Sequence, residues 1–250
     1  MYNFAGMKHE LKVIAGELLG RKAKPSNLNA DKTQLIDFAR DRLGMKSFAD
    51  LGGVWNVDGG YTFYAMENPI AGVLVDTNFT PAVLGKRKQY PALKIIEGNF
   101  GHPAMPARIG KVDAVFFFDT LLHQVNPDWD AVLRMYTDIA RIFLIFNQQY
   151  VHFPATMRLL DLGLEEYARN VPHALAEEPY KSYFSDLEAI HPQHQRPYRD
   201  IHNIWQWGII DKDLIAHMEL LGYKLQFYKN CGQFGNLSNV ENHSFAFSRG

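Results

Sequence analysis

Short apolar segments that recur along the chain constrain its fold most strongly. Helical stretches such as Trp129–Arg141 lie between several of them. Apolar strands that alternate with helices are typical of a parallel sheet with both faces covered. We therefore predict an α/β fold with a doubly wound, mostly parallel sheet. Its first five strands are predicted at Ser47–Leu51, Gly72–Asp76, Lys94–Glu97, Val112–Phe118 and Ile142–Phe146.

Two helices are predicted before the first strand. Residues 7–20 carry apolar side chains at helical spacing. In the second helix Asp31 is the predicted N-cap, Gln34 completes a capping box, and Gly44 ends the helix. We expect residues 1–45 to form an N-terminal helical extension. The apolar stripe of the second helix consists of Leu35, Ile36, Phe38, Ala39 and Leu43.

The pattern changes again in the second half of the chain. Residues 152–206 lack regular periodicity and are rich in histidine, proline and aromatic side chains. Because long irregular segments inside a domain are usually functional, we predict a lid inserted into a domain that spans residues 46–250. Asp211 then caps a helix, and two alternating segments, Tyr223–Lys229 and His243–Arg249, predict a closing antiparallel hairpin.

Composition and charge narrow the class of partner. The chain has 250 residues, of which 47% are hydrophobic and 21% are charged, as in an ordinary globular protein. Lys and Arg number 26 against 27 Asp and Glu, so the net charge is -1. A nearly neutral chain has no general attraction to nucleic acid. The one basic cluster, Lys86–Lys88, is short, so we predict a small-molecule substrate and no nucleic acid.

The number of cysteines and the distribution of apolar residues indicate the cellular compartment. Cys231 is the only cysteine, which excludes an intramolecular disulfide and argues against a cysteine-based zinc site. The first 20 residues carry Lys8, His9, Glu10 and Lys12 among their apolar residues and have no uninterrupted apolar run, unlike a signal peptide. No segment has the roughly 18 apolar residues needed to span a bilayer. We expect a cytoplasmic protein with no membrane association.

A glycine turn follows the first predicted strand. Gly52 and Gly53 come directly after Asp50 and Leu51, where glycine lets the backbone turn sharply and approach a ligand. Asp76 ends the second strand, and a carboxylate there can accept both hydroxyls of a ribose. The turn lacks the G-x-G-x-x-G spacing that suits a pyrophosphate. A nucleoside cofactor without phosphates therefore fits better.

These segments resemble the successive cofactor motifs of class I S-adenosylmethionine-dependent methyltransferases. The resemblance rests on Phe48–Gly53, Val73–Asp76, Glu97–Phe100 and Asp113–Asp119, and it covers residues 46 to about 147. It implies a Rossmann-like sheet of seven strands with an antiparallel last strand, and S-adenosylmethionine as the cofactor. The closing hairpin matches the terminal strands of that family.

The resemblance also implies a set of cofactor-binding residues at the strand ends. Asp76 would hold the ribose hydroxyls, Asn99 and Phe100 would lie beside the adenine, and the others would surround the methionine part. The full set is Asp50, Gly52, Gly53, Asp76, Asn99, Phe100 and Asp119.

The glycine turn departs from the commoner family pattern. The family usually has Gly-x-Gly after the first acid, whereas this chain has Gly52-Gly53-Val54-Trp55. The longer segment Val54–Tyr61 resembles a subgroup of bacterial small-molecule methyltransferases, some of which are linked to surface-sugar modification.

Candidate residues for the methyl acceptor follow the fourth and fifth strands. His123 lies four residues beyond Asp119 and is a candidate general base, because its ordinary pKa is near neutral. The alternative is a histidine that only packs or caps a helix start. Polar residues after the fifth strand and a tryptophan in the lid are predicted to bind the substrate; the alternatives are a solvated loop and a packing tryptophan. They are Asn147, Gln148, Tyr150 and Trp205.

A metal is not predicted. His191, His194 and His202 lie close together in sequence, but their spacing matches no established ligand pattern. Polar positions in the lid are the preferred interpretation of these histidines.

The sequence therefore predicts an enzyme that transfers a methyl group from S-adenosylmethionine to a small polar acceptor. The acceptor atom is predicted to be a hydroxyl oxygen, for example of a sugar or sugar-derived metabolite. Two alternatives stay open: an NAD-dependent oxidoreductase on a related fold, and a non-catalytic partner protein that keeps the fold. The sequence also leaves open whether the chain forms a homodimer.

Overall fold

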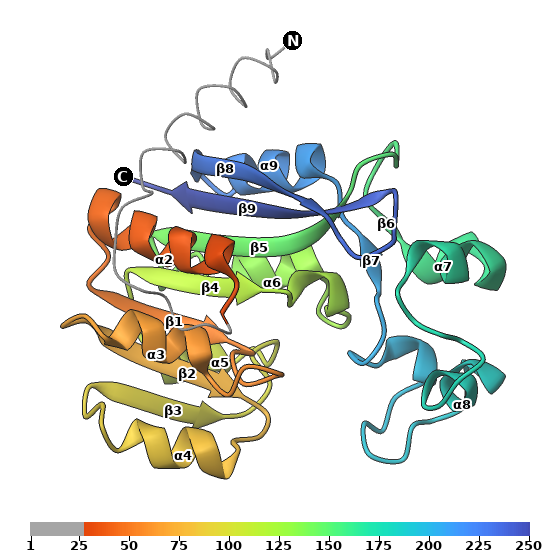
Figure 1. The fold of residues 1–250 in the computed structure, drawn as a ribbon, viewed down its shortest axis with the longest axis horizontal. Helices are drawn as coiled ribbons and strands as arrows, with labels where there is room; N and C mark the ends of the chain where they lie inside the picture. Colours follow the sequence, from red (N-terminus) through yellow and green to blue (C-terminus); the bar gives the residue numbers. More distant parts are fainter. Residues whose placement is uncertain (1–27) are drawn as a thin grey trace.

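The computed structural model describes residues 28–250 (Figure 1). The helix predicted over residues 7–20 lies outside the described residues. Within residues 28–250, no helix is both long enough and apolar enough to cross a membrane.

A seven-stranded sheet forms the centre of the molecule, in the order β3-β2-β1-β4-β5-β9-β8 (Figure 1). The first five strands are parallel, and β9 inserts antiparallel between β5 and β8. The predicted fold class, with its antiparallel last strand, is confirmed. The strands are β1 (Ser47–Leu51), β2 (Ala71–Asp76), β3 (Leu93–Glu97), β4 (Ala114–Phe118), β5 (Ile142–Tyr150), β8 (Lys224–Gln233) and β9 (Val240–Ser248).

Helices cover both faces of the sheet. One core cluster packs under α2 (Ala30–Arg42), α3 (Gly60–Met66) and α4 (Pro81–Arg87). The other packs under α5 (Met105–Ile109), α6 (Trp129–Met135) and α9 (Asp211–Leu220). Because side chains of a strand alternate between faces, Asp50 of β1 points toward the α2–α3 side together with Phe48.

The start of α2 differs from the prediction. The N-cap is Asn29 and not Asp31, and its side chain accepts hydrogen bonds from the backbone N–H groups of Asp31 and Lys32. An asparagine cap satisfies amides that the first helical turn leaves free. The helix contacts β5, β9 and α3, so it is one of the layers on the sheet. Gly44, with φ +64°, follows the helix as predicted.

The fifth strand is longer than predicted. The polar residues Asn147–Tyr150, which were predicted to follow the strand, continue β5 and pair with Val240–His243 of β9. This pairing satisfies their backbone groups, and their side chains are buried. The predicted helix Trp129–Arg141 is shorter, because α6 ends at Met135 and residues 136–139 form a turn.

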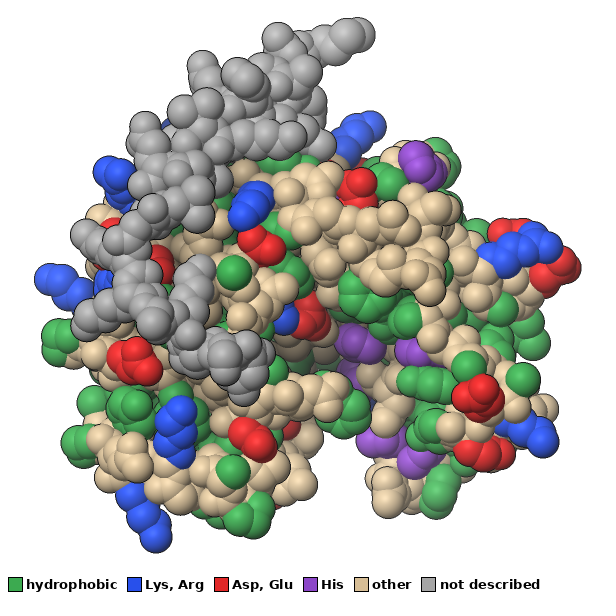
Figure 2. Space-filling view, viewed as in Figure 1, with side chains coloured by type: hydrophobic (Ala, Val, Ile, Leu, Met, Phe, Trp, Pro, Cys, Tyr) green, Lys and Arg blue, Asp and Glu red, His purple; other side chains and the backbone are tan. Residues whose placement is uncertain are grey.

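Residues 152–206 form a lobe beyond the carboxyl ends of the parallel strands (Figure 1). The lobe contains α7 (Leu164–Asn170) and α8 (Tyr180–Ser185) and has a hydrophobic cluster of its own. A short ladder between β6 (Met157–Arg158) and β7 (Trp207–Gly208) closes its base. Figure 2 shows a hollow between this lobe and the sheet, with histidine side chains gathered around it.

Candidate active site

The turn after β1 leaves no room for side chains. Gly52 has φ +79°, and a Cβ there would lie 3.1 Å from Thr120 Cγ2 and 3.3 Å from Phe100 Cε1. A Cβ on Gly53 would lie 2.4 Å from the carboxylate of Asp50. Both glycines are therefore required, the first by its conformation and narrow surroundings and the second by the buried acid beneath it. The structure thus places Gly52 beside Phe100 and Gly53 beside Asp50, and their contact with a cofactor stays a prediction.

Asp50 is a fully buried carboxyl group. The Thr62 hydroxyl donates a hydrogen bond of 2.5 Å to it. Burial raises the pKa of Asp50 to about 6, and the nearby Asp76 carboxylate adds to this rise. The Thr62 hydrogen bond and the ammonium group of Lys32 act in the opposite direction. The site therefore holds an acid that a cationic ligand would favour in its charged form.

Asp76 ends β2 and joins the first two strand ends. Its carboxylate accepts hydrogen bonds from the Val54 N–H at 2.9 Å and from the Thr77 N–H at 2.7 Å. These bonds fix the carboxylate beside the glycine turn. Because each carboxylate oxygen can accept more than one hydrogen bond, the group retains capacity for ligand hydroxyls.

Asn99 and Phe100 follow β3 on the loop beside the turn. The Asn99 side chain accepts a hydrogen bond of 2.7 Å from the Gly101 N–H, and Asn99 is exposed. The Phe100 carbonyl accepts a hydrogen bond of 2.7 Å from the Tyr136 hydroxyl, which holds the ring next to Gly52.

Asp119 lies at the end of β4 in an unusual backbone conformation. Its φ is +56°, a region that residues other than glycine rarely adopt and that is often found at functional sites. One carboxylate oxygen accepts a hydrogen bond of 2.8 Å from Gln148, and the other forms an ion pair with Lys32. The side chain is 40% exposed, so part of it stays open.

Sequence reasoning missed Lys32. Its side chain is buried, and its ammonium group lies 4.7 Å from the centre of the Phe146 ring and 5.1 Å from that of Tyr61. The available signal was the spacing: Lys32 precedes Leu35 and Ile36 by three and four residues, which places it on their face of the helix.

His123 ends a short 3-10 helix, Leu121–His123, directly after the tip of β4. Its Nδ1 donates a hydrogen bond of 3.1 Å to the carbonyl of Ile204, and Nδ1 of His202 donates one of 3.0 Å to the His123 carbonyl. Burial lowers the pKa of His123, against the effect of the nearby Asp119 carboxylate. The imidazole is therefore neutral near pH 7, with Nε2 as the nitrogen able to accept a proton.

The four predicted substrate-binding residues are buried. Asn147 accepts a hydrogen bond of 3.3 Å from the Leu122 N–H, and the Tyr150 hydroxyl donates one of 2.5 Å to the Asn170 carbonyl. Gln148 bonds to Asp119, as above, and Trp205 packs on Tyr150 in the core of the lobe. Tyr150 and Trp205 thus join the lobe to the sheet, whereas Asn147 and Gln148 bond to the segment that follows β4. Direct contact with a substrate stays a prediction.

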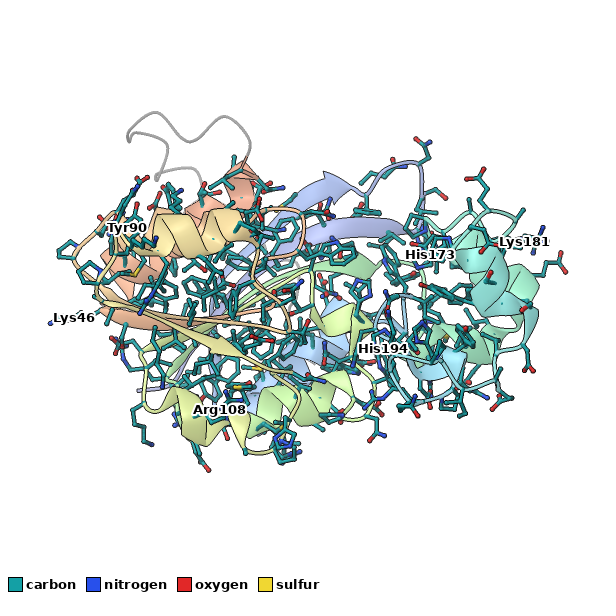
Figure 3. All side chains as sticks on the ribbon, turned by 90° about the horizontal axis from the view of Figure 1, so that it is seen from below. Lys46, Tyr90, Arg108, His173, Lys181 and His194 are labelled. Atoms are coloured by element: carbon teal, nitrogen blue, oxygen red, sulfur yellow. The ribbon has the colours of Figure 1, made fainter. Side chains whose placement is uncertain are left out.

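His173 and His194 lie on the side of the lobe nearer the sheet, while Lys181 lies on its outer side (Figure 3). His173 stacks on Tyr180 and accepts a hydrogen bond of 3.1 Å from the Trp205 N–H through Nε2. Burial, with a smaller contribution from His123, lowers the pKa of His173 to about 4. Within residues 28–250, no three His, Cys, Asp or Glu side chains are grouped to hold a metal ion.

No family model and no curated protein matches the sequence, but solved structures match the fold. One is the 1,6-didemethyltoxoflavin-N1-methyltransferase of Burkholderia thailandensis, with bound 1,6-didemethyltoxoflavin and S-adenosylhomocysteine. Its TM-score is 0.54 at 9% identity, over 99% of this chain and 85% of that one. The N-terminal domain of EvdMO1 with SAH bound has a TM-score of 0.56 at 14% identity, over 96% of each chain.

A third similar structure is TehB from Haemophilus influenzae, with a TM-score of 0.56 at 9% identity, over 92% of this chain and 65% of that one. Together with the strand order, these matches decide the architecture. The chain has the class I methyltransferase fold. The fold predicted from the motifs is confirmed.

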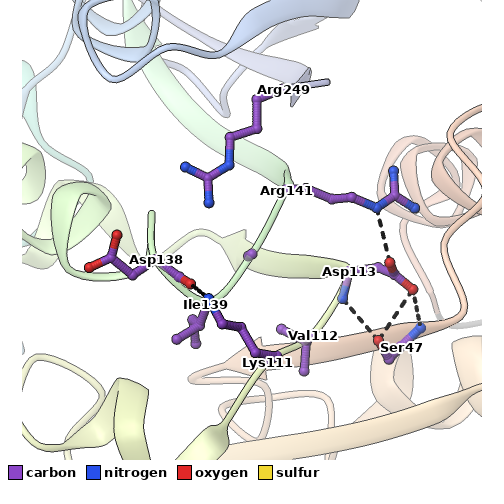
Figure 4. Close-up of a pocket in the computed structure, with 9 residues that line it drawn as sticks. Ser47, Lys111, Val112, Asp113, Asp138, Ile139, Arg141 and Arg249 are labelled. Atoms are coloured by element: carbon purple, nitrogen blue, oxygen red, sulfur yellow. Dashed lines mark hydrogen bonds and ion pairs between the residues drawn. The ribbon is translucent and has the colours of Figure 1, made fainter.

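A cavity of about 300 Å³ lies at the opposite edge of this methyltransferase fold (Figure 4). At its wall Asp113 accepts hydrogen bonds from the backbone N–H groups of Lys46 and Ser47 and from Arg141. Arg141 also donates to the carbonyls of Leu43 and Gly44. These charged groups join the amino ends of the strands, far from the carboxyl ends where open α/β sheets bind ligands.

Proposed function

We propose that the chain is an S-adenosylmethionine-dependent methyltransferase that methylates a hydroxyl of a small polar acceptor, such as a sugar-derived metabolite. One observation carries the proposal. Asp50, Asp76 and Asp119 lie at the ends of three adjacent strands, around a glycine turn that lies next to Phe100 and Thr120.

The residues at this edge suit the cofactor. S-adenosylmethionine carries an ammonium group, a sulfonium and a ribose diol, and three carboxylates face that combination of charge and hydrogen-bond donors. Gly52 has φ +79° beside Thr120 and Phe100, where a side chain would not fit, so the turn presents its backbone. The buried hydroxyl of Thr120 has no hydrogen-bond partner among residues 28–250, so a ligand can supply one.

The chain's own residues mainly bind and orient. When bound, the cofactor supplies an electrophilic methyl carbon, and the reaction then needs an acceptor oxygen held in line at about 3 Å. Asp76 would hold the ribose hydroxyls, and Asp50 would face the ammonium group. The lobe of residues 152–206 covers the same edge and would exclude water from it (Figure 1).

His123 would remove the proton of the acceptor hydroxyl. Because its Nδ1 proton is held by the Ile204 carbonyl, Nε2 is the basic atom. Asp119 and His123 both accept hydrogen bonds, so an acceptor with hydroxyl donors suits this end of the site. This arrangement supports O-methylation of a polyhydroxyl compound.

The oxidoreductase alternative lacks a pyrophosphate site. In dinucleotide-binding folds a helix N-terminus follows the glycine turn directly and faces the phosphates. Here α3 begins only at Gly60, and residues 53–59 intervene after Gly52. This spacing favours a cofactor without phosphates.

Calorimetry with S-adenosylhomocysteine tests the proposal. We expect the wild type to bind, and Asp76→Ala to bind about tenfold more weakly or worse, since charge-assisted hydrogen bonds to the ribose are lost. Asp138→Ala, an exposed acid at the opposite cavity, is the matched control and should leave the affinity unchanged.

Failure of the wild type to bind S-adenosylhomocysteine would overturn the proposal. Quenching of NADH fluorescence in the same preparation would then favour the oxidoreductase, and no binding of either cofactor would favour the non-catalytic partner. If binding is found, a screen of sugars and sugar nucleotides for S-adenosylhomocysteine formation tests the acceptor class.

A further inference from the structure

Lys32 is a buried cation at the edge of the candidate site. It is 7% exposed, it forms an ion pair with Asp119, and it lies close enough to Asp50 to affect its titration. Burying an ammonium group is costly unless partners compensate for the lost water. One carboxylate and two ring faces are the partners present here.

Negative side chains outnumber positive ones at the ends of β1, β2 and β4. Asp50, Asp76 and Asp119 contribute three carboxylates to the strand tips, and Lys32 contributes an ammonium group between two of them. An ammonium group has three N–H donors. Asp119 accepts one hydrogen bond from it, which leaves donors for a further anionic group.

The amino-acid part of the proposed cofactor carries both charges. Its ammonium group is attracted to Asp50 and Asp119, but its carboxylate would be repelled by the same acids, because like charges in a poorly hydrated site interact strongly. That carboxylate needs a cation at this edge of the sheet.

We propose that Lys32 binds the amino-acid carboxylate of the cofactor, while Asp50 and Asp119 face its ammonium group. This inference rests on the proposed function. It assigns a cofactor-binding role to a residue of α2, outside the motifs that the sequence resemblance covers.

Contacts around α2 hold Lys32 in place before any ligand arrives. The Asn29 N–H donates a hydrogen bond of 3.0 Å to the Tyr61 hydroxyl, at the start of α3. On the other side of the helix, Lys229 of β8 donates to Asp31 at 2.6 Å and to Gln34 at 3.1 Å. A cation fixed in this way loses little conformational entropy on binding.

Two ligands distinguish carboxylate binding by Lys32 from a general effect of the substitution on the structure of the site. S-adenosylhomocysteine has the amino-acid carboxylate, whereas 5′-methylthioadenosine keeps the adenosine and lacks the amino acid. By calorimetry, we expect Lys32→Met to weaken S-adenosylhomocysteine binding about tenfold or more and to change methylthioadenosine binding less than about twofold. Lys32→Arg should keep most of the affinity, and Asp76→Ala should weaken both ligands.

Equal affinity of Lys32→Met and wild type for S-adenosylhomocysteine would overturn the inference. So would an equal loss for both ligands, which is the result expected of a merely structural lysine. Circular dichroism checks that the variant is folded; if Lys32→Met is not, Lys32→Gln is measured with the same two ligands. Failure of the wild type to bind either ligand would instead reject the proposed function.

Discussion

Asp50 shows how a single side chain can be unfavourable for folding and favourable for binding. Its pKa is about 6 in the folded chain, mainly because of burial, against 3.8 as the ordinary value. The folded state therefore holds this proton more tightly than the unfolded state does. The contribution of this bound proton to the free energy of unfolding is fully present below pH 3.8 and is lost as the pH rises through 6. At pH 7 the ionised group costs on the order of 3 kcal/mol.

Replacement of Asp50 by Asn should therefore stabilise the ligand-free protein. We expect Asp50→Asn to raise the midpoint of thermal unfolding at pH 7 by up to about 10 °C, because a cost of about 3 kcal/mol is removed at about 2–4 °C per kcal/mol for a chain of this size. At pH 5 the gain should shrink, because the wild-type acid is then mostly protonated. Affinity for S-adenosylhomocysteine should fall. Differential scanning calorimetry at both pH values measures the effect.

A lower midpoint for Asp50→Asn at pH 7 would contradict this account. It would mean that the ionised carboxylate, with its Thr62 hydrogen bond and the nearby Lys32, stabilises the fold even without a ligand.

At the scale of elements, histidines join the lobe of residues 152–206 to the tip of β4. His123 donates to the Ile204 carbonyl and His202 donates to the His123 carbonyl. Burial lowers the pKa of His123, His173 and His202. A folded pKa below the unfolded value means that the folded state binds fewer protons. The contribution of this contact to the free energy of unfolding is therefore fully present above about pH 6.5. It decreases as the pH falls below that value.

His173 gives the clearest test at this scale. We expect its imidazole to stay neutral at pH 5.5 and to titrate near 4, because it is buried against Tyr180 and Trp205. NMR titration of the histidine ring signals, with His173→Gln to assign the resonance, measures this value. A midpoint at 6.5 or above would show that the ring is in contact with water, and that the lobe stands open in solution.

At the scale of the whole molecule, the carboxyl and amino ends of the parallel strands, which form two opposite edges of the sheet, carry different groups of residues. The carboxyl edge holds the candidate site, and the amino edge holds the ionic network of Asp113 and Arg141 (Figure 4). Burial would raise the pKa of Asp113, but the hydrogen bonds from Lys46, Arg141 and Ser47 outweigh it, so the pKa is lowered. The stability from this group is present above pH 3.8 and is lost as the pH falls through the folded value.

Asp113→Ala should destabilise the protein and spare the site. We expect a loss of about 1–3 kcal/mol in the free energy of unfolding, since the Arg141 guanidinium and two backbone N–H groups lose their acceptor. Affinity for S-adenosylhomocysteine should be unchanged, because the substitution lies at the other edge of the sheet. Urea denaturation and calorimetry measure the two quantities. A loss of affinity like that of Asp76→Ala would show that the edges are coupled.

The amino-acid sequence by itself determined the sheet and the acids at its edge. Segments rich in apolar residues placed β1 to β4 within about two residues, and β4, buried at every position, is apolar throughout. The acids Asp50, Asp76 and Asp119 were predicted at strand ends, and parallel strands bring such ends to one edge.

Only the tertiary structure decided the positions of residues whose partners are distant in sequence. Asn147–Tyr150 were placed beyond the end of the fifth strand, because nothing local indicates that β9 pairs with them from 90 or more residues away. Tyr150 and Trp205 are packed inside because the lobe builds its own core. Lys32 reaches Asp119 only because α2 lies across β5, and a charge paired over 87 residues leaves no periodic signal in the sequence.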